Sequence, residues 1–246
     1  MNTDRSCCDL ARRRSVLRSL LGLAAAAAVS AMPPAMRVSA AAALTQAQRD
    51  ALTPDAVLAL ALRGNDRFRT GKMKAHDYLA QKRATAGGQY PAAAILSCID
   101  SRAPAEIILD AGIGDTFNAR IAGNIADDDI LGSLEFACAA AGAKLILVIG
   151  HTACGAIKGA IDGVELGHLT GLLNQIKPAV AATQYAGART SKNGEFVDAV
   201  AATNVRRTVT DIRTRSSVLA GLEKDGKIKI VGSMYHLNGG RVELLS

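Results

Sequence analysis

Three side chains with the donor atoms that zinc prefers lie in two short segments of this sequence. Cys98 is in the first segment, and His151 and Cys154 are three residues apart in the second, so both of these can face one metal ion. Two thiolates and one imidazole are a ligand set that suits Zn²⁺. Three protein ligands leave a fourth coordination position free, which distinguishes catalytic zinc sites from structural ones. The set therefore predicts one catalytic Zn²⁺ per subunit.

The elements that must position these ligands are two buried strands. Apolar runs at residues 92–96 and 145–149 directly precede the two segments. Open α/β sheets keep their sites at the carboxyl ends of such strands. The alternative is that Cys98 and Cys154 are ordinary buried thiols, since free cysteine is among the most buried residue types. Two cysteines in strand-end loops beside a histidine favour the metal site.

The two segments resemble the signature pair of the β-class carbonic anhydrases. Residues 98–102 (Cys-Ile-Asp-Ser-Arg) carry one half and residues 151–155 (His-Thr-Ala-Cys-Gly) the other, and weaker similarity extends from about Asn65 to Leu245. The resemblance implies a carbonic anhydrase (a carbonate dehydratase, or zinc lyase). Such an enzyme reversibly hydrates carbon dioxide to bicarbonate and a proton by means of a zinc-bound hydroxide. Carbon dioxide and bicarbonate are then its small-molecule partners.

Three further residues receive roles in this interpretation. The carboxylate of Asp100 can accept a hydrogen bond from the zinc-bound hydroxide, and Arg102 would keep that carboxylate ionised and oriented. Gln89 stands in a Gly-Gln-Tyr-Pro turn that resembles the family's turn, and is a candidate to donate a hydrogen bond to a substrate oxygen. The alternative for Gln89 is ordinary turn polarity.

The resemblance also implies an inactive state, in which Asp100 leaves Arg102 and becomes the fourth zinc ligand. One subgroup of the family closes in this way when bicarbonate binds a separate pocket that uses a tryptophan. The corresponding position here is Ile95, and the chain contains no tryptophan. An isoleucine cannot donate the indole hydrogen bond, so we expect water rather than Asp100 in the fourth position.

Other classes of function stay open or are excluded by the composition. A non-catalytic protein that binds zinc and bicarbonate, and a related hydrolase of CS₂ or COS, would use the same ligands. A thiol redox protein is disfavoured because no Cys-x-x-Cys is present. A net charge of +7 and 3% aromatic residues give little support for nucleic-acid binding.

Residues 1–40 have the pattern of an export signal peptide that is removed. Arg13 and Arg14 resemble the twin-arginine motif, and the apolar stretch at 20–29 is too short for a comfortable membrane span. We therefore predict a periplasmic protein that engages the export machinery, with an uncleaved amphipathic anchor as the alternative. Removal of the leader also removes Cys7 and Cys8, and two of the three remaining cysteines are metal ligands, so no disulfide framework is expected.

The rest of the sequence predicts a linker at residues 41–52 and one carbonic anhydrase domain at 53–246. Strands alternate with helices, which indicates an α/β fold with a mainly parallel sheet flanked by helices. The first helix has Thr53 as N-cap and Pro54 at its first position. We expect it to form an N-terminal helical arm across a partner, since the family resemblance implies a homodimer or a higher homo-oligomer.

Two details of the domain can also be predicted. Asp129 is expected to cap a helix over residues 130–141. Residues 238–240 (Asn-Gly-Gly) form a turn signal that should lead into a final antiparallel strand at 242–245.

Overall fold

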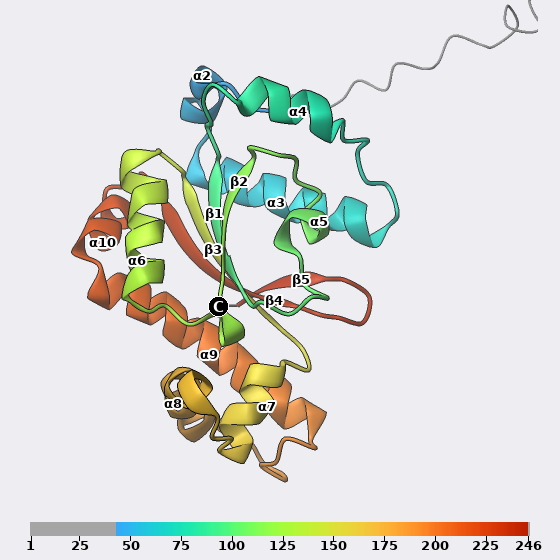
Figure 1. Cartoon of the computed structure of the whole chain (residues 1–246), viewed down its shortest axis with the longest axis vertical. Helices are drawn as coiled ribbons and strands as arrows, with labels where there is room; N and C mark the ends of the chain where they lie inside the picture. The colour runs from blue at the N-terminus through green and yellow to red at the C-terminus, as the bar shows by residue number, and fades with distance from the viewer. Residues whose placement is uncertain (1–42, 246) are drawn as a thin grey trace, which may run out of the picture. The chain divides into compact units, whose positions relative to one another are not determined.

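A five-stranded sheet organises the part of the chain that the computed structural model describes, residues 43–245 (Figure 1). The predicted leader lies outside these residues. The strand order is β2-β1-β3-β4-β5. The strands are β1 (Ala93–Ser97), β2 (Thr116–Arg120), β3 (Leu145–His151), β4 (Lys229–Tyr235) and β5 (Val242–Leu245). The first four run parallel and β5 pairs antiparallel with β4, which confirms the predicted fold class and the final hairpin.

Helices cover both faces of this sheet (Figure 1). They are α2 (Gln46–Asp50), α3 (Pro54–Arg69), α4 (Tyr78–Thr85), α5 (Ala105–Ile108), α6 (Asp128–Glu135), α7 (Gly155–Asp162), α8 (Gly167–Ala182), α9 (Gly194–Arg215) and α10 (Ser217–Lys224). A 3₁₀ turn at Ala122–Asn124 and a π-helical turn at Phe136–Ala140 complete the structure. None of the helices in this part of the chain is long and apolar enough to cross a membrane.

Strands β1 and β3 are buried on both sides, which explains their continuous apolar sequences. Successive side chains of a strand point to opposite faces. Leu96 and Val148 accordingly contribute to the core beneath α6 and α9, whereas Ile95 and Leu147 contribute to the core beneath α3 and α5. The carboxyl ends of the two strands therefore lie side by side in a rigid setting, where the two predicted metal segments begin.

Helix α3 begins as predicted, but it packs on the sheet of its own chain. The Thr53 side chain accepts a hydrogen bond from the Ala56 N–H at 3.2 Å, and Pro54 is the first helical residue. Val57 and Leu58 are buried in the core beside β3. Part of the apolar surface of this helix is thus covered within one subunit, whereas Leu60 is 40% exposed, and the arm across a partner stays a prediction.

The predicted linker at residues 41–52 is wrong over residues 46–50, which form helix α2. Thr45 and Gln48 make a capping box at its start, which stabilises a short helix. Arg49 is buried and donates a hydrogen bond to the Ala141 carbonyl. This segment therefore belongs to the domain.

The helix expected over residues 130–141 starts earlier, at Asp128, and its hydrogen-bonding pattern changes from α-helical to π-helical after Glu135. Asp127, and not Asp129, caps α6, because its carboxylate accepts the Ile130 N–H at 2.9 Å. Because residues 127–129 are all aspartate, the sequence alone does not show which of them caps the helix. The α-helical part ends at Glu135 and passes into the π-helical turn, where Cys138 is buried. Burial raises the pKa of Cys138 to about 12, so this cysteine is a neutral core residue.

Helix α9 lies directly against β3 next to the second metal segment. A Cβ atom at Gly150 would lie 2.5 Å from Val205 Cγ2 and 2.9 Å from Met234 Sδ, so only glycine permits this approach. Val200, Val205, Val209 and Ile212 form an apolar stripe on α9 and are buried. The close contact fixes the middle of α9 relative to β3, one residue before the metal ligand His151.

Candidate metal centre

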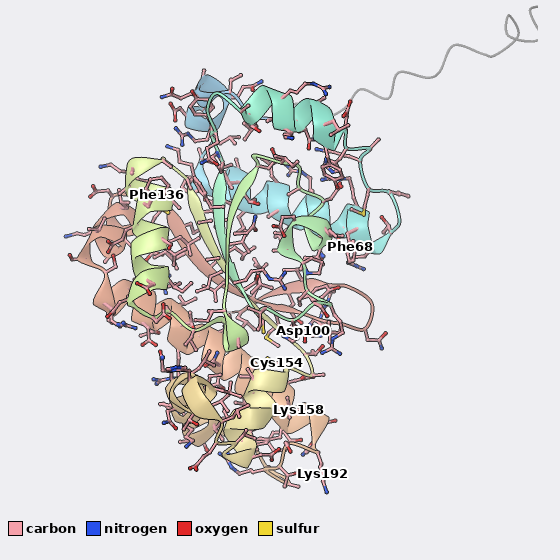
Figure 2. All side chains as sticks on the ribbon, viewed as in Figure 1. Phe68, Asp100, Phe136, Cys154, Lys158 and Lys192 are labelled. Carbon is pink, nitrogen blue, oxygen red and sulfur yellow. The ribbon has the colours of Figure 1, made fainter. Side chains whose placement is uncertain are left out.

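Cys98, His151 and Cys154 meet at the carboxyl ends of β1 and β3. Cys98 follows β1, His151 is the last residue of β3, and Cys154 directly precedes α7. Their ligand atoms all lie within 4.8 Å of one another, and the two sulfur atoms are 4.0 Å apart. All three residues are buried, and Figure 2 shows Cys154 and Asp100 at this end of the sheet, next to α7. The structure thus brings together the three predicted ligands.

The arrangement of donor atoms fits a zinc ion. His151 Nδ1–H donates to the Thr152 carbonyl at 2.9 Å, which leaves Nε2 as the free lone-pair nitrogen. This Nε2 atom is buried and has no hydrogen-bond partner, which is uncommon for a buried polar group and calls for an explanation. Two Zn–S bonds in tetrahedral geometry separate their sulfur atoms by about 3.8 Å, close to the 4.0 Å observed. One metal ion would explain both the lack of a hydrogen-bond partner at His151 Nε2 and the distance between the two sulfur atoms.

The electrostatics of the two cysteines favour cation binding. The hydrogen bond from the Cys154 thiol lowers the pKa of Cys98 to about 4, and the Gly123 N–H also donates to Cys98 Sγ, at 3.4 Å. The resulting Cys98 thiolate raises the pKa of Cys154, because a second negative charge beside it is unfavourable. Burial opposes a charged His151, but the Cys98 thiolate raises the pKa of this histidine. A dication would relieve the repulsion between two thiolates.

Asp100 lies beside this group and is held by Arg102. The Arg102 Nε–H donates to Asp100 Oδ1 at 3.0 Å, its Nη2–H donates to Oδ2 at 2.8 Å, and its backbone N–H donates to Oδ1 at 2.9 Å. The hydrogen bonds from the guanidinium hold the pKa of Asp100 well below its usual range, although burial opposes this. Asp100 Oδ2 is 3.7 Å from His151 Nε2. The carboxylate is therefore ionised and paired with Arg102 at the edge of the metal group.

Two residues outside the two signature segments support the metal centre. Arg120, at the end of β2, donates from Nε to the Cys98 carbonyl at 2.9 Å and from Nη2 to the Asp100 carbonyl at 2.6 Å, which fixes the first segment. Asp198, on α9, accepts the Ala153 N–H of the second segment at 2.7 Å. Neither belongs to the two motifs. The one sequence feature that could have pointed to Arg120 is its position at the end of a strand.

Gln89 does not reach the metal group of its own chain. It is exposed and precedes β1, whereas Cys98 follows the opposite end of the same strand. Five residues of strand span roughly 16 Å, which is too far for a hydrogen bond to anything bound at the cysteines. The role of Gln89 in substrate binding therefore stays a prediction, because within one subunit a strand lies between its turn and the metal ligands.

Comparison with protein families and curated proteins gives consistent relatives. Residues 93–242 match the family model described as carbonic anhydrase. The chain is 37% identical to carbonic anhydrase 2 of Mycobacterium tuberculosis, over 74% of this chain and 87% of that protein. It is 36% identical to a carbonic anhydrase of Mycolicibacterium smegmatis, over 74% of this chain and 89% of that protein.

Solved structures show the same fold. A tetrameric β-carbonic anhydrase of Sordaria macrospora is 26% identical with a TM-score of 0.60, and the match covers 77% of this chain and 96% of that one. The β-carbonic anhydrase CafA of Aspergillus fumigatus is 26% identical with a TM-score of 0.61, with coverage of 77% and 90%. The sheet and its flanking helices are therefore shared with proteins of this kind.

Proposed function

The chain belongs to the β-class carbonic anhydrase family, and on that premise we propose how its own residues perform the reaction. The protein is a zinc-dependent carbonic anhydrase that reversibly hydrates carbon dioxide to bicarbonate and a proton. We assign the zinc ion to Cys98, His151 and Cys154. The observation that carries this assignment is the buried Nε2 of His151, which has no hydrogen-bond partner although the ligand atoms of the three residues lie within 4.8 Å of one another.

Asp100 and Arg102 then hold the reacting groups in position and do not transfer a proton themselves. Zinc, when bound, lowers the pKa of a coordinated water towards neutrality and so supplies a nucleophile. Because Arg102 keeps Asp100 ionised, this carboxylate can only accept a hydrogen bond near neutral pH. Its position 3.7 Å from His151 Nε2 places it beside the ligand atoms. We assign Asp100 to orientation of the nucleophile and Arg102 to orientation of Asp100.

The inactive state, with Asp100 as fourth zinc ligand, requires the Asp100–Arg102 pair to break. The pair consists of two side-chain hydrogen bonds in the bidentate geometry that makes such contacts strong. Ile95, at the position where one subgroup has a tryptophan, is an apolar residue buried in the core. We therefore propose that the arrangement with Asp100 held by Arg102 is the resting one.

Zinc analysis and a CO₂-hydration assay on the same purified sample test the proposed function. We expect one zinc ion per chain and robust CO₂ hydration that is lost when the metal is removed by a chelator. A protein that binds zinc stoichiometrically without hydrating CO₂ would contradict the proposal in favour of a non-catalytic bicarbonate-binding protein. Hydrolysis of CS₂ or COS without CO₂ hydration would favour the hydrolase, which the comparisons do not favour.

The exposed position of Gln89 suggests that a second copy of the chain completes the site. Gln89 precedes β1 next to β2, whose outer edge is unpaired among the described strands. Phe117 of β2 and Phe136, which is 58% exposed, line a cavity of about 590 Å³ along this edge. An open apolar cavity beside an unpaired strand is a surface that a partner can cover. We propose a homodimer or higher oligomer in which Gln89 reaches the partner's metal centre.

Complementation between two defective chains tests this arrangement. We expect Gln89→Ala to lower kcat/KM for CO₂ hydration about tenfold, the loss of roughly one hydrogen bond. Co-expression of Gln89→Ala with Cys98→Ser chains should restore activity, because mixed oligomers pair an intact metal site with an intact Gln89. Mixed oligomers that are no more active than the two parents combined would contradict a shared site.

We also propose that residues 1–40 direct export by the twin-arginine route and that the mature enzyme is periplasmic. The support is the Arg13-Arg14 pair before a short apolar run. A route for folded proteins suits a metalloprotein, since metal binding and folding are coupled.

Substitution of both arginines tests the export signal. Arg13→Lys combined with Arg14→Lys should leave essentially all of the protein unprocessed in the cytoplasm, because the signal depends on the pair. Cell fractionation with immunoblotting measures this, and Arg12→Lys is a matched control that should be processed normally. Normal export of the double variant would overturn the twin-arginine interpretation.

A further inference from the structure

One peptide group lies at the centre of the second metal segment and connects α9 with a zinc ligand. It joins Thr152 to Ala153, between His151 and Cys154. Its N–H donates to Asp198 Oδ1 at 2.7 Å, and its carbonyl oxygen accepts the His151 Nδ1–H at 2.9 Å. Both bonds use one rigid planar unit, so displacement of one end of the peptide moves the other.

The backbone at this peptide adopts a conformation that needs external support. Ala153 has φ of +54°, in the left-handed region that residues other than glycine usually avoid. Such conformations persist only where the surrounding structure holds them. On the strand side, the Thr152 N–H donates to the Tyr235 carbonyl at 3.1 Å, and Thr152 Oγ1 accepts the Leu237 N–H at 3.0 Å. On the helix side, Asp198 supplies the hydrogen bond to Ala153.

Asp198 itself is carried by a firmly placed part of α9. Phe196, Val197 and Val200, its neighbours on that helix, are fully buried. The contact of Val205 with Gly150 holds the same helix against β3, one residue before His151. The carboxylate therefore approaches the metal segment from a support that is fixed independently of the segment's own conformation.

We propose that Asp198 is a positioning residue for the zinc centre, acting on His151 through the peptide between Thr152 and Ala153. A carboxylate that accepts the peptide N–H fixes the plane of that peptide and polarises it, so its carbonyl becomes a better acceptor for Nδ1–H. This bond sets the tautomer and the ring orientation of His151, and with them the direction of Nε2 towards the two sulfurs. The inference rests on the proposed zinc assignment and gives Asp198 no contact with substrate.

The rate of zinc release from the purified holoenzyme to a colorimetric chelator tests the proposal. Loss of a group that orients a metal ligand typically weakens metal binding 10- to 100-fold, so we expect Asp198→Ala to release zinc roughly tenfold faster or more. Asp198→Asn keeps an oxygen acceptor but loses the charge, and should release zinc roughly threefold faster. The cobalt-substituted Asp198→Ala protein should show shifted visible absorption bands, because its ligand geometry changes.

Asp211→Ala is the matched control, since Asp211 lies nearer the C-terminal end of the same helix, away from the metal segment. Its zinc release and cobalt spectrum should match the wild type even if its melting temperature falls. Release from Asp198→Ala at the rate of this control, with an unchanged cobalt spectrum, would overturn the proposal. Where Asp198→Ala does not yield folded protein, Asp198→Asn carries the same comparison. A wild type that retains no zinc would instead contradict the zinc assignment itself.

Discussion

Cys98→Ser is expected to remove zinc from the purified enzyme and to lower kcat/KM for CO₂ hydration by at least about a thousandfold. Serine has nearly the same shape, but its hydroxyl stays protonated at neutral pH and is a poor zinc ligand. Only His151 and Cys154 would then hold the ion. Hydrogen bonds from Cys154 and Gly123 stabilise a thiolate at position 98, so replacing it removes the ligand best prepared to bind a cation.

Metal content by atomic emission and stopped-flow CO₂ hydration measure this effect on one preparation. Cys138→Ser is the matched control, because it makes the same chemical change at a buried cysteine in the π-helical turn. That variant should keep stoichiometric zinc and near wild-type kcat/KM. A Cys98→Ser protein with full zinc and full rate would remove Cys98 from the metal site.

Asp100→Asn and Arg102→Ala should each lower kcat/KM by about a hundredfold, the usual size of an effect on a positioned polar group near the reacting atoms. The double variant should be little worse than either single one, because residues that act as a unit are non-additive. The basis is the bidentate pair at 2.8 and 3.0 Å, in which neither partner keeps its orientation once the other is removed.

Zinc content must stay stoichiometric in all three variants for this comparison to report on orientation. Arg69→Ala breaks an exposed ion pair with Asp66 on α3 and should leave the rate unchanged. Single effects that simply multiply in the double variant, to roughly ten-thousandfold, would show that the two residues work independently.

The sequence predicted the metal ligands well because each belongs to a local pattern with one structural meaning. An apolar run followed at once by Cys98 or His151 places the ligand at a strand end, and parallel strands bring such ends together. Thr53 before Pro54 fixed the start of α3 for a similarly local reason. Burial on both faces of β1 and β3 then made the strand assignments secure.

The details that the sequence left open or misplaced depend on contacts between distant segments. The turn of Gln89 precedes β1, and its motif carries no information on which subunit's site it faces. Asp127 rather than Asp129 caps α6, and local preference does not separate neighbouring aspartates. Asp198 lies in a helix with no motif, and its bond to Ala153 exists only because α9 crosses β3 at Gly150.

Because Cys138 is buried, the reactivity of the domain's cysteines towards thiol reagents depends on whether metal is bound. Thiol reagents react with the thiolate form, and a cysteine whose pKa is raised to about 12 is almost entirely protonated at neutral pH. The other two cysteines of the described residues are Cys98 and Cys154. In a chain without Cys7 and Cys8, reagent consumed by the native protein would therefore report an uncoordinated Cys98, because the pKa of Cys154 is also raised and that of Cys98 is lowered. Titration with a chromogenic disulfide would follow demetallation in real time, with no isotope and no enzyme assay.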